Sequence, residues 1–355
     1  MFEYLVLVNP LGMMYGSAGA FLSPENLVGR SGAKFPPDAA TLAGLFFSTD
    51  RYKSKSAKLK RDFYVAGPFW GKRKKTNQPP DGIYVPIPRN LIIGESQRSQ
   101  WKLKERDGKL EWHREKKHEE IESDFSWQLV STWMHQSKSP DKKLKAISEE
   151  AEKTPWQYNP ILHPRLQEDQ RVTLEKNGLF LENAVQMNPE TCLVYLSTHE
   201  LEKDWYRFGG ENHLVEIDCV PLKGAFKKLL EQKIERTFAL ITPGVWGSGR
   251  LSYRYPQAWE KEPLMLTEKP VPYRYYIGGK LGRGRYAVPA GSVYVLDEPL
   301  NKAWWDWDEA WFPKEGIVEN DGTNKGDGPL TTKHFGSGLC LPIDIVISNK
   351  NETIW

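Results

Sequence analysis

The sequence predicts an α+β protein built mainly from antiparallel sheets. Short apolar runs rich in β-branched and aromatic residues recur along the chain, bounded by Pro, Gly or Asn. Few segments carry apolar residues at helical spacing, and strand-like runs lie before and after each of them. Strands grouped around isolated helices are typical of α+β architecture. The pattern predicts strands at residues 2–8, 62–70, 83–88, 178–181, 191–197, 213–220, 238–242, 273–277, 292–296 and 339–347.

Two segments predict helices. The first, residues 39–47, begins after Asp38, a residue suited to an N-cap. The second, residues 222–236, begins after Pro221. In both segments the apolar side chains recur every three or four residues, so each helix has one face to bury.

The order of elements fits two ferredoxin-like halves. We predict a first domain over residues 1–221 and a second over residues 222–355. Residues 95–160 are dense in Lys, Arg and Glu and poor in aliphatic side chains. They predict a charged insertion in the first domain, with a helix over residues 141–153.

The composition describes a chain with a core and little net charge. It has 355 residues, of which 39% are hydrophobic, and a formal net charge of +3. No apolar run approaches the roughly 18 residues that span a bilayer, and residues 1–9 lack the basic start of a signal peptide. We therefore expect a cytoplasmic protein with no membrane association. Three widely spaced cysteines argue against disulfides, and Cys192 and Cys219 lie in strand-like runs that predict buried thiols.

No catalytic or metal-binding motif is present in the sequence. The seven histidines and three cysteines form neither H-E-x-x-H nor C-x-x-C, and no Walker A or G-x-S-x-G motif occurs. We expect no enzymatic activity, no metal and no cofactor.

Three glycine-containing segments carry cations or aromatic residues: 208–211 (FGGE), 278–285 (GGKLGRGR) and 333–338 (KHFGSG). Glycine lets backbone N–H groups approach a phosphate, and neighbouring cations neutralise it. An aromatic ring beside such a loop can stack on a base. The combination favours single-stranded RNA binding, although each segment taken singly is also typical of a simple turn.

Several short motifs, in order, resemble the RAMP-superfamily third subunit of type III-B CRISPR Cmr complexes. Residues 288–294 (VPAGSVY) are the most specific of them. The others are residues 35–44 (FPPDAATLAG), 67–69 (GPF), 85–88 (VPIP), 171–180 (RVT followed by GLF), 209–211 (GGE), 242–244 (TPG) and 336–338 (GSG). The sequence departs from the family where an R-D-G-R-P-F segment is expected, at residues 12–30, and in its more basic residues 280–285.

The resemblance implies two packed ferredoxin-like, RRM-like domains. It implies a non-catalytic subunit that holds the repeat-derived 5′ tag of the guide RNA (crRNA) in defence against foreign nucleic acid. It also implies contacts with the large polymerase-like subunit and with backbone RAMP subunits. The residues that we expect to contact RNA are Lys280, Arg283, Arg285, Lys333, His334, Phe335, Arg171, Arg207, Gly209, Gly210, Lys34 and Arg30.

Two other functions stay open from the sequence. A metal-independent RAMP endoribonuclease that processes repeat RNA would use a general acid or base, for which His334 is the natural candidate. A carbohydrate-binding or hydrolytic β-protein is suggested by the aromatic and acidic residues 304–311. We favour packing as the role of most of the fourteen tryptophans.

Overall fold

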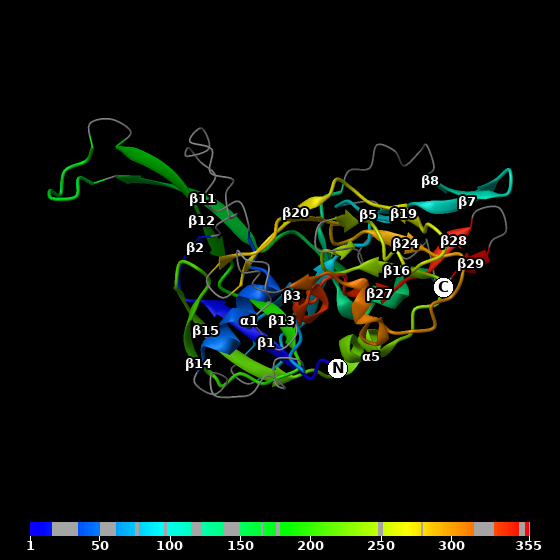
Figure 1. The fold of residues 1–355 in the computed structure, drawn as a ribbon, viewed down its shortest axis with the longest axis horizontal. Coiled ribbons are helices and arrows are strands. Elements are labelled where there is room, and N and C mark those ends of the chain that lie inside the picture. The colour runs from blue at the N-terminus through cyan, green and yellow to red at the C-terminus, as the bar shows by residue number, and fades with distance from the viewer. Residues whose placement is uncertain are drawn as a thin grey trace, which may run out of the picture.

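A computed structural model gives the fold of the chain, which is mainly antiparallel sheet (Figure 1). It describes residues 1–15, 35–49, 62–74, 78–95, 98–114, 123–137, 150–164, 166–174, 178–247, 251–277, 280–315, 330–347 and 352–354. Within these residues there are two α-helices, α1 (Ala39–Ser48) and α5 (Gly224–Glu231). The predicted α+β class is confirmed.

An eight-stranded antiparallel sheet forms the centre of the N-terminal part. Its strand order is β10-β9-β4-β3-β13-β1-β15-β14. The strands are β1 (Tyr4–Pro10), β3 (Val65–Lys72), β4 (Ile83–Pro86), β9 (Trp127–Leu129), β10 (Ala151–Glu152), β13 (Thr191–Ser197), β14 (Asp204–Phe208) and β15 (His213–Pro221). The strands predicted near residues 2–8, 62–70, 83–88, 191–197 and 213–220 are confirmed.

The two faces of this sheet are covered by different parts of the chain. Side chains alternate along β1, so Val6 and Val8 join the core beneath α1, whereas Leu5 and Leu7 join a second core. That second core contains residues from α5 and the C-terminal strands. Asp38 occupies the N-cap position of α1 as predicted, although its side chain makes no capping hydrogen bond.

A four-stranded sheet, of order β19-β24-β16-β27, forms the centre of the C-terminal part. Its strands are β16 (Thr237–Leu240), β19 (Leu264–Leu266), β24 (Val293–Val295) and β27 (Cys340–Pro342). The predicted second helix is shorter than expected, because α5 ends at Glu231 and Ile234 instead forms a β-bridge with Lys302. The predicted final strand is divided into β27 and β28 (Ile345–Ile347).

Two hairpins extend from these sheets (Figure 1). One is an arm formed by β11 (Trp156–Pro164) and β12 (Leu179–Met187), joined at its base by β2 (Met14–Tyr15). The other is formed by β7 (Lys102–Arg106) and β8 (Lys109–His113), beside β28 and β29 (Glu352–Ile354).

The charged segment at residues 95–160 is partly integrated into the fold. It supplies β9 and β10 to the edge of the central sheet, and its Trp133 is buried in the core. The helix predicted over residues 141–153 is wrong at its end, where Ala151–Glu152 forms β10; residues 141–149 lie outside the described part. Because β28 pairs with β7, the last strands return to the N-terminal part. The domain boundary near Pro221 stays a prediction.

Shorter elements connect the sheets. The remaining strands are β5 (Leu91–Ile93), β6 (Arg98–Gln100), β17 (Trp246–Gly247), β18 (Ser252–Tyr253), β20 (Val271–Tyr273), β21 (Tyr276–Ile277), β22 (Lys280–Leu281), β23 (Arg285–Ala287), β25 (Lys314–Glu315) and β26 (Leu330–Thr331). The 3-10 helices are η3 (Val130–Ser137), η5 (Trp304–Asp306), η6 (Glu309–Trp311) and η7 (Thr332–Phe335).

Candidate nucleic-acid interface

Residues in or next to the three glycine segments share one buried cluster with α1. One buried cluster contains α1 side chains together with Phe208, Tyr273, Tyr275 and Phe335, which flank or precede those segments in the sequence. The rings of Tyr275 and Phe335 lie 5.2 Å apart. A Cβ on Gly209 would lie 4.0 Å from the Thr41 side chain of α1. Segments separated by more than a hundred residues therefore form one region of the molecule.

The C-terminal glycine segment is a packing junction. Gly336 has φ +72°, and a Cβ there would lie 2.5 Å from the Cα atom of Ala66 in β3. Ser337 Oγ accepts a hydrogen bond of 2.8 Å from the Val245 N–H group. Only glycine fits this close backbone approach in the left-handed region. The segment therefore joins β3 to the turn before β17.

The side chains expected beside this segment point into the protein. Lys333 is 4% exposed, and its ammonium donates to the carbonyl oxygens of Trp305 (2.7 Å) and Trp307 (2.6 Å). Burial lowers the pKa of Lys333 to about 8. His334 is buried, its ring stacks on Tyr64 at 4.3 Å, and its Nδ1 accepts from the Thr331 N–H group. In this structure none of these side chains is presented to a ligand.

The aromatic cluster at residues 304–311 also belongs largely to the core. Trp304 and Trp307 are buried there, and Lys333 lies 5.5 Å from the ring centroid of Trp304. Packing is thus the role that the structure gives to these rings, as the sequence analysis favoured. Cys192 and Cys340 are buried free thiols and Cys219 is half-buried.

The two arginines of the basic glycine segment (residues 278–285) differ in their exposure to solvent. Along β23, Arg285 is buried and forms an ion pair with Glu315, whereas Tyr286 is 63% exposed. Burial raises the pKa of Glu315 to about 7, although Arg285 opposes the shift. Arg283 is exposed. Side chains alternate along a strand, so this inward arginine and outward tyrosine follow from one register.

The other expected contacts lie apart from one another. Arg171 is exposed in the turn between β11 and β12, at the end of the arm. Arg207 is exposed on β14, on the sheet face opposite α1, because its neighbour Phe208 packs beneath the helix. Gly209 and Gly210 form the turn beside α1. The main chain of Lys280 lies in β22. Arg30 and Lys34 lie outside the described residues.

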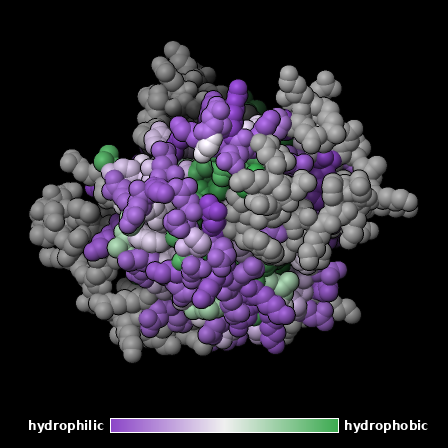
Figure 2. Space-filling model, turned by 90° about the vertical axis from the view of Figure 1, so that its right-hand side faces the viewer, coloured by the Kyte–Doolittle hydropathy of each residue, from purple (hydrophilic) through white to green (hydrophobic). Residues whose placement is uncertain are grey.

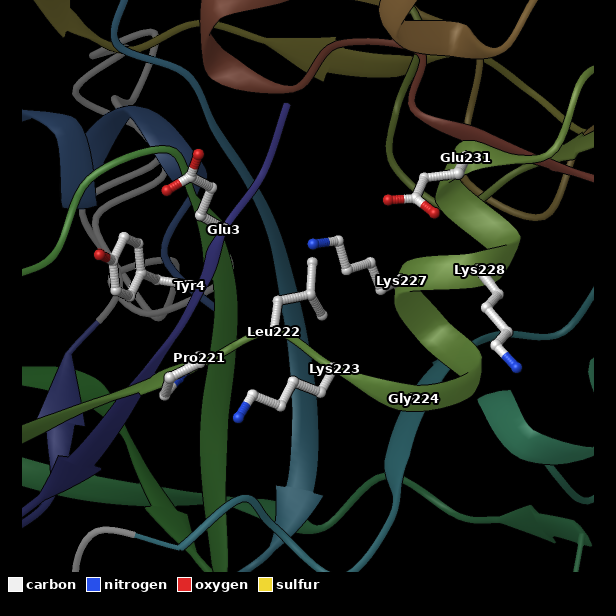
Figure 3. A pocket seen from close by; sticks show the side chains of 9 residues that line it. All are labelled: Glu3, Tyr4, Pro221, Leu222, Lys223, Gly224, Lys227, Lys228 and Glu231. Carbon is white, nitrogen blue, oxygen red and sulfur yellow. The ribbon is translucent and has the colours of Figure 1, made fainter.

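A cavity of about 530 Å³, which no sequence pattern predicted, lies between the start of β1 and α5 (Figure 3). Lys223, Lys227 and Lys228 line it, together with Glu3 and Glu231. The three lysines at the start of the second predicted helix could have indicated this cavity, but only the apolar residues of that segment were used to predict the helix. Tyr286 was missed as well, and the alternation of residues 285–287 could have identified it.

The surface and the ionisable groups give few other features. The face that carries β7, β8 and β28 is mainly hydrophilic where it is described (Figure 2). Among the described residues, no group of three or more His, Cys, Asp or Glu side chains could hold a metal ion. Within the same residues, no helix is long and apolar enough to cross a membrane.

A family model decides the relationship of this chain to known proteins. The model for CRISPR-associated protein (Cas_Cmr3) matches residues 14–342. The chain belongs to the Cas_Cmr3 family. The resemblance to subunits of type III CRISPR complexes is thereby confirmed at the level of the family, while the place of the subunit within a complex stays a prediction. A search of curated proteins gave no significant match.

Solved structures of type III CRISPR complexes are similar at low identity. A chain of type III-B Cmr-beta bound to cognate target RNA has 11% identity and a TM-score of 0.45, with 82% of this chain and 86% of that chain covered. A chain of the Csm3-Csm4 subcomplex of the type III-A interference complex has 11% identity and a TM-score of 0.44, with 83% and 93% covered.

The most specific family motif has a structural role. In residues 288–294, Gly291 has φ +84°, and its carbonyl oxygen accepts from the Arg89 N–H group at 2.8 Å. A Cβ on Gly291 would lie 2.7 Å from the carbonyl oxygen of Ile87. The motif therefore holds β24 against residues 85–88, another segment of the resemblance.

Proposed function

We propose that this protein is a non-catalytic RNA-binding subunit of a type III-B CRISPR effector complex. Its role is to hold the 5′ repeat-derived tag of the guide RNA and to dock the large polymerase-like subunit and the backbone RAMP subunits. Membership of the Cas_Cmr3 family supports the assembly.

One observation carries the RNA-binding part of the proposal. The exposed Tyr286 and Arg283 lie three residues apart, and Ala287, in the same strand as Tyr286, joins the buried cluster that contains α1. A ring stacks on unpaired bases and an arginine binds phosphate, which together suit single-stranded RNA. The contacts that we retain are Arg283, Lys280, the Gly209–Gly210 turn and, more distantly, Arg171 and Arg207. Four other expected contacts are buried, and their role here is to support this surface by packing: Arg285, Lys333, His334 and Phe335.

The test is co-purification. The tagged chain is expressed with its genomic neighbours and a CRISPR array, and the RNA that it carries is sequenced. We expect guide RNA with a common 5′ segment together with a large partner subunit. Tyr286→Ala and Arg283→Ala should each lower the RNA recovered without changing the partner, whereas Lys104→Ala on β7 should change neither. Recovery of a monomer without RNA would refute the proposal.

The absence of catalysis is tested separately. Repeat RNA is incubated with the purified chain in EDTA, and we expect it to stay intact. The burial of His334 and its bond from Thr331 support this expectation. Cleavage that disappears in a folded His334→Gln variant would instead establish the endoribonuclease.

A further inference from the structure

The cavity beside α5, here called the lysine cavity, is lined by backbone that a hydrogen bond and core packing hold in place. The Leu222 N–H group donates to the carbonyl oxygen of Glu3 at 2.7 Å, which joins the segment before the helix to the start of β1. Leu222 is buried, and Phe226 and Leu229 anchor the other side of α5 in the core. The charged side chains are therefore carried by backbone that is held in place.

The lysines of this cavity differ from other described surface lysines in their ion pairs. Lys223, Lys227 and Lys228 form no ion pair with any described residue. By contrast, Lys72, Lys153 and other surface lysines lie within 4 Å of a carboxylate. Burial lowers the pKa of the Met1 amine, Glu3 opposes this shift, and Lys227 adds to it. The lysines thus hold positive charge that an anion can neutralise.

Acidic and basic side chains lie toward opposite ends of the cavity. Figure 3 shows Glu3 and Glu231 toward one end, Lys223 at the other, and Lys227 reaching between them. A ribonucleotide has the matching polarity, because its phosphate is an anion and its 2′-hydroxyl donates to a carboxylate. A volume of about 530 Å³ lies in the range of small-ligand sites.

We propose that the lysine cavity binds one nucleotide of the guide RNA strand, with the phosphate at Lys223 and Lys227 and the ribose 2′-hydroxyl at Glu3 or Glu231. This inference rests on the proposed function and extends it to a site away from the glycine segments. An acidic segment of a partner protein would also satisfy the lysines. A nucleotide differs from such a segment because it carries a hydroxyl donor for the two carboxylates of the cavity beside its anion for the lysines.

The test is fluorescence anisotropy of labelled guide RNA, and of DNA of the same sequence, titrated with the full chain over a range of salt concentrations. The variant Lys223→Gln/Lys227→Gln removes both positive charges and keeps polar side chains of similar helix preference. We expect it to weaken RNA binding about tenfold or more. Because single strands give a slope of about 0.7 per neutralised phosphate and one phosphate is held here, the salt slope should become shallower by about 0.7. Glu3→Gln/Glu231→Gln should reduce the preference for RNA over DNA.

The matched control is Lys104→Gln/Lys109→Gln, which removes the same charge from the hairpin of β7 and β8 and should bind as the parent does. If the parent binds RNA and Lys223→Gln/Lys227→Gln binds it equally with an unchanged slope, the inference is wrong and the proposed function stands. If that variant keeps RNA but loses the large subunit on co-purification, the cavity is a protein contact and the inference is again overturned. A parent that binds no RNA overturns both.

Discussion

Replacing Lys333 with alanine tests whether this lysine stabilises the core rather than binding RNA. Removal of three methylenes costs about 2.4 kcal/mol of burial. Two carbonyl oxygens, of Trp305 and Trp307, lose their donor at about 2 kcal/mol each. Burial lowers the pKa of Lys333 from 10.5 to about 8, so removal of the ammonium regains roughly 3 kcal/mol at neutral pH. The expected net loss of unfolding free energy is about 3 kcal/mol.

Guanidinium unfolding followed by tryptophan fluorescence measures this loss. Lys104→Ala, an exposed lysine on β7, is the control and should change the unfolding free energy by less than about 0.5 kcal/mol. A folded Lys333→Ala variant that keeps the stability of the parent but loses guide RNA would refute the reasoning.

A second measurement is the pH dependence of the difference in unfolding free energy between the parent and Lys333→Ala. Above pH 8 the native protein releases the Lys333 proton, while the unfolded chain keeps it up to about pH 10.4. Stability rises with pH wherever the unfolded state binds more protons. The stability advantage of the parent over Lys333→Ala should therefore grow between pH 8 and 10.4, by up to about 3 kcal/mol. A difference that stays flat or shrinks over this range would contradict the burial of a charged lysine.

Three further predictions use neighbouring residues as controls. Arg285→Ala should lower the unfolding free energy by about 3–5 kcal/mol, because Glu315 is left buried without its partner; an effect below 1 kcal/mol would contradict the ion pair. Arg283→Ala should leave stability within about 0.5 kcal/mol but weaken RNA binding, with a salt slope shallower by about 0.7. Gly336→Ala should cost about 2–4 kcal/mol through contact with β3 and its left-handed backbone. Gly210→Ala, which meets nothing within 4 Å, should be as stable as the parent.

Local patterns were sufficient to predict the first helix and several strands of the central sheets, but not β7, β8, β9 and β10 in the charged segment. The run at residues 2–8 predicts β1 because alternating side chains enter two cores, and both faces of the strand are apolar. The end of the second helix was not predictable in this way. Ile234 continues the helical spacing, but its backbone pairs with Lys302, far along the chain.

The sequence by itself determined the fold class, several strands of the two central sheets, the family and the presence of three glycine segments. Only the tertiary structure decided which cations face outward. Lys333 and Arg285 are buried because their partners, the carbonyl oxygens of residues 305 and 307 and the carboxylate of Glu315, lie about thirty residues away and are brought close by the fold. Local sequence reports charge and spacing, whereas burial depends on contacts between distant segments.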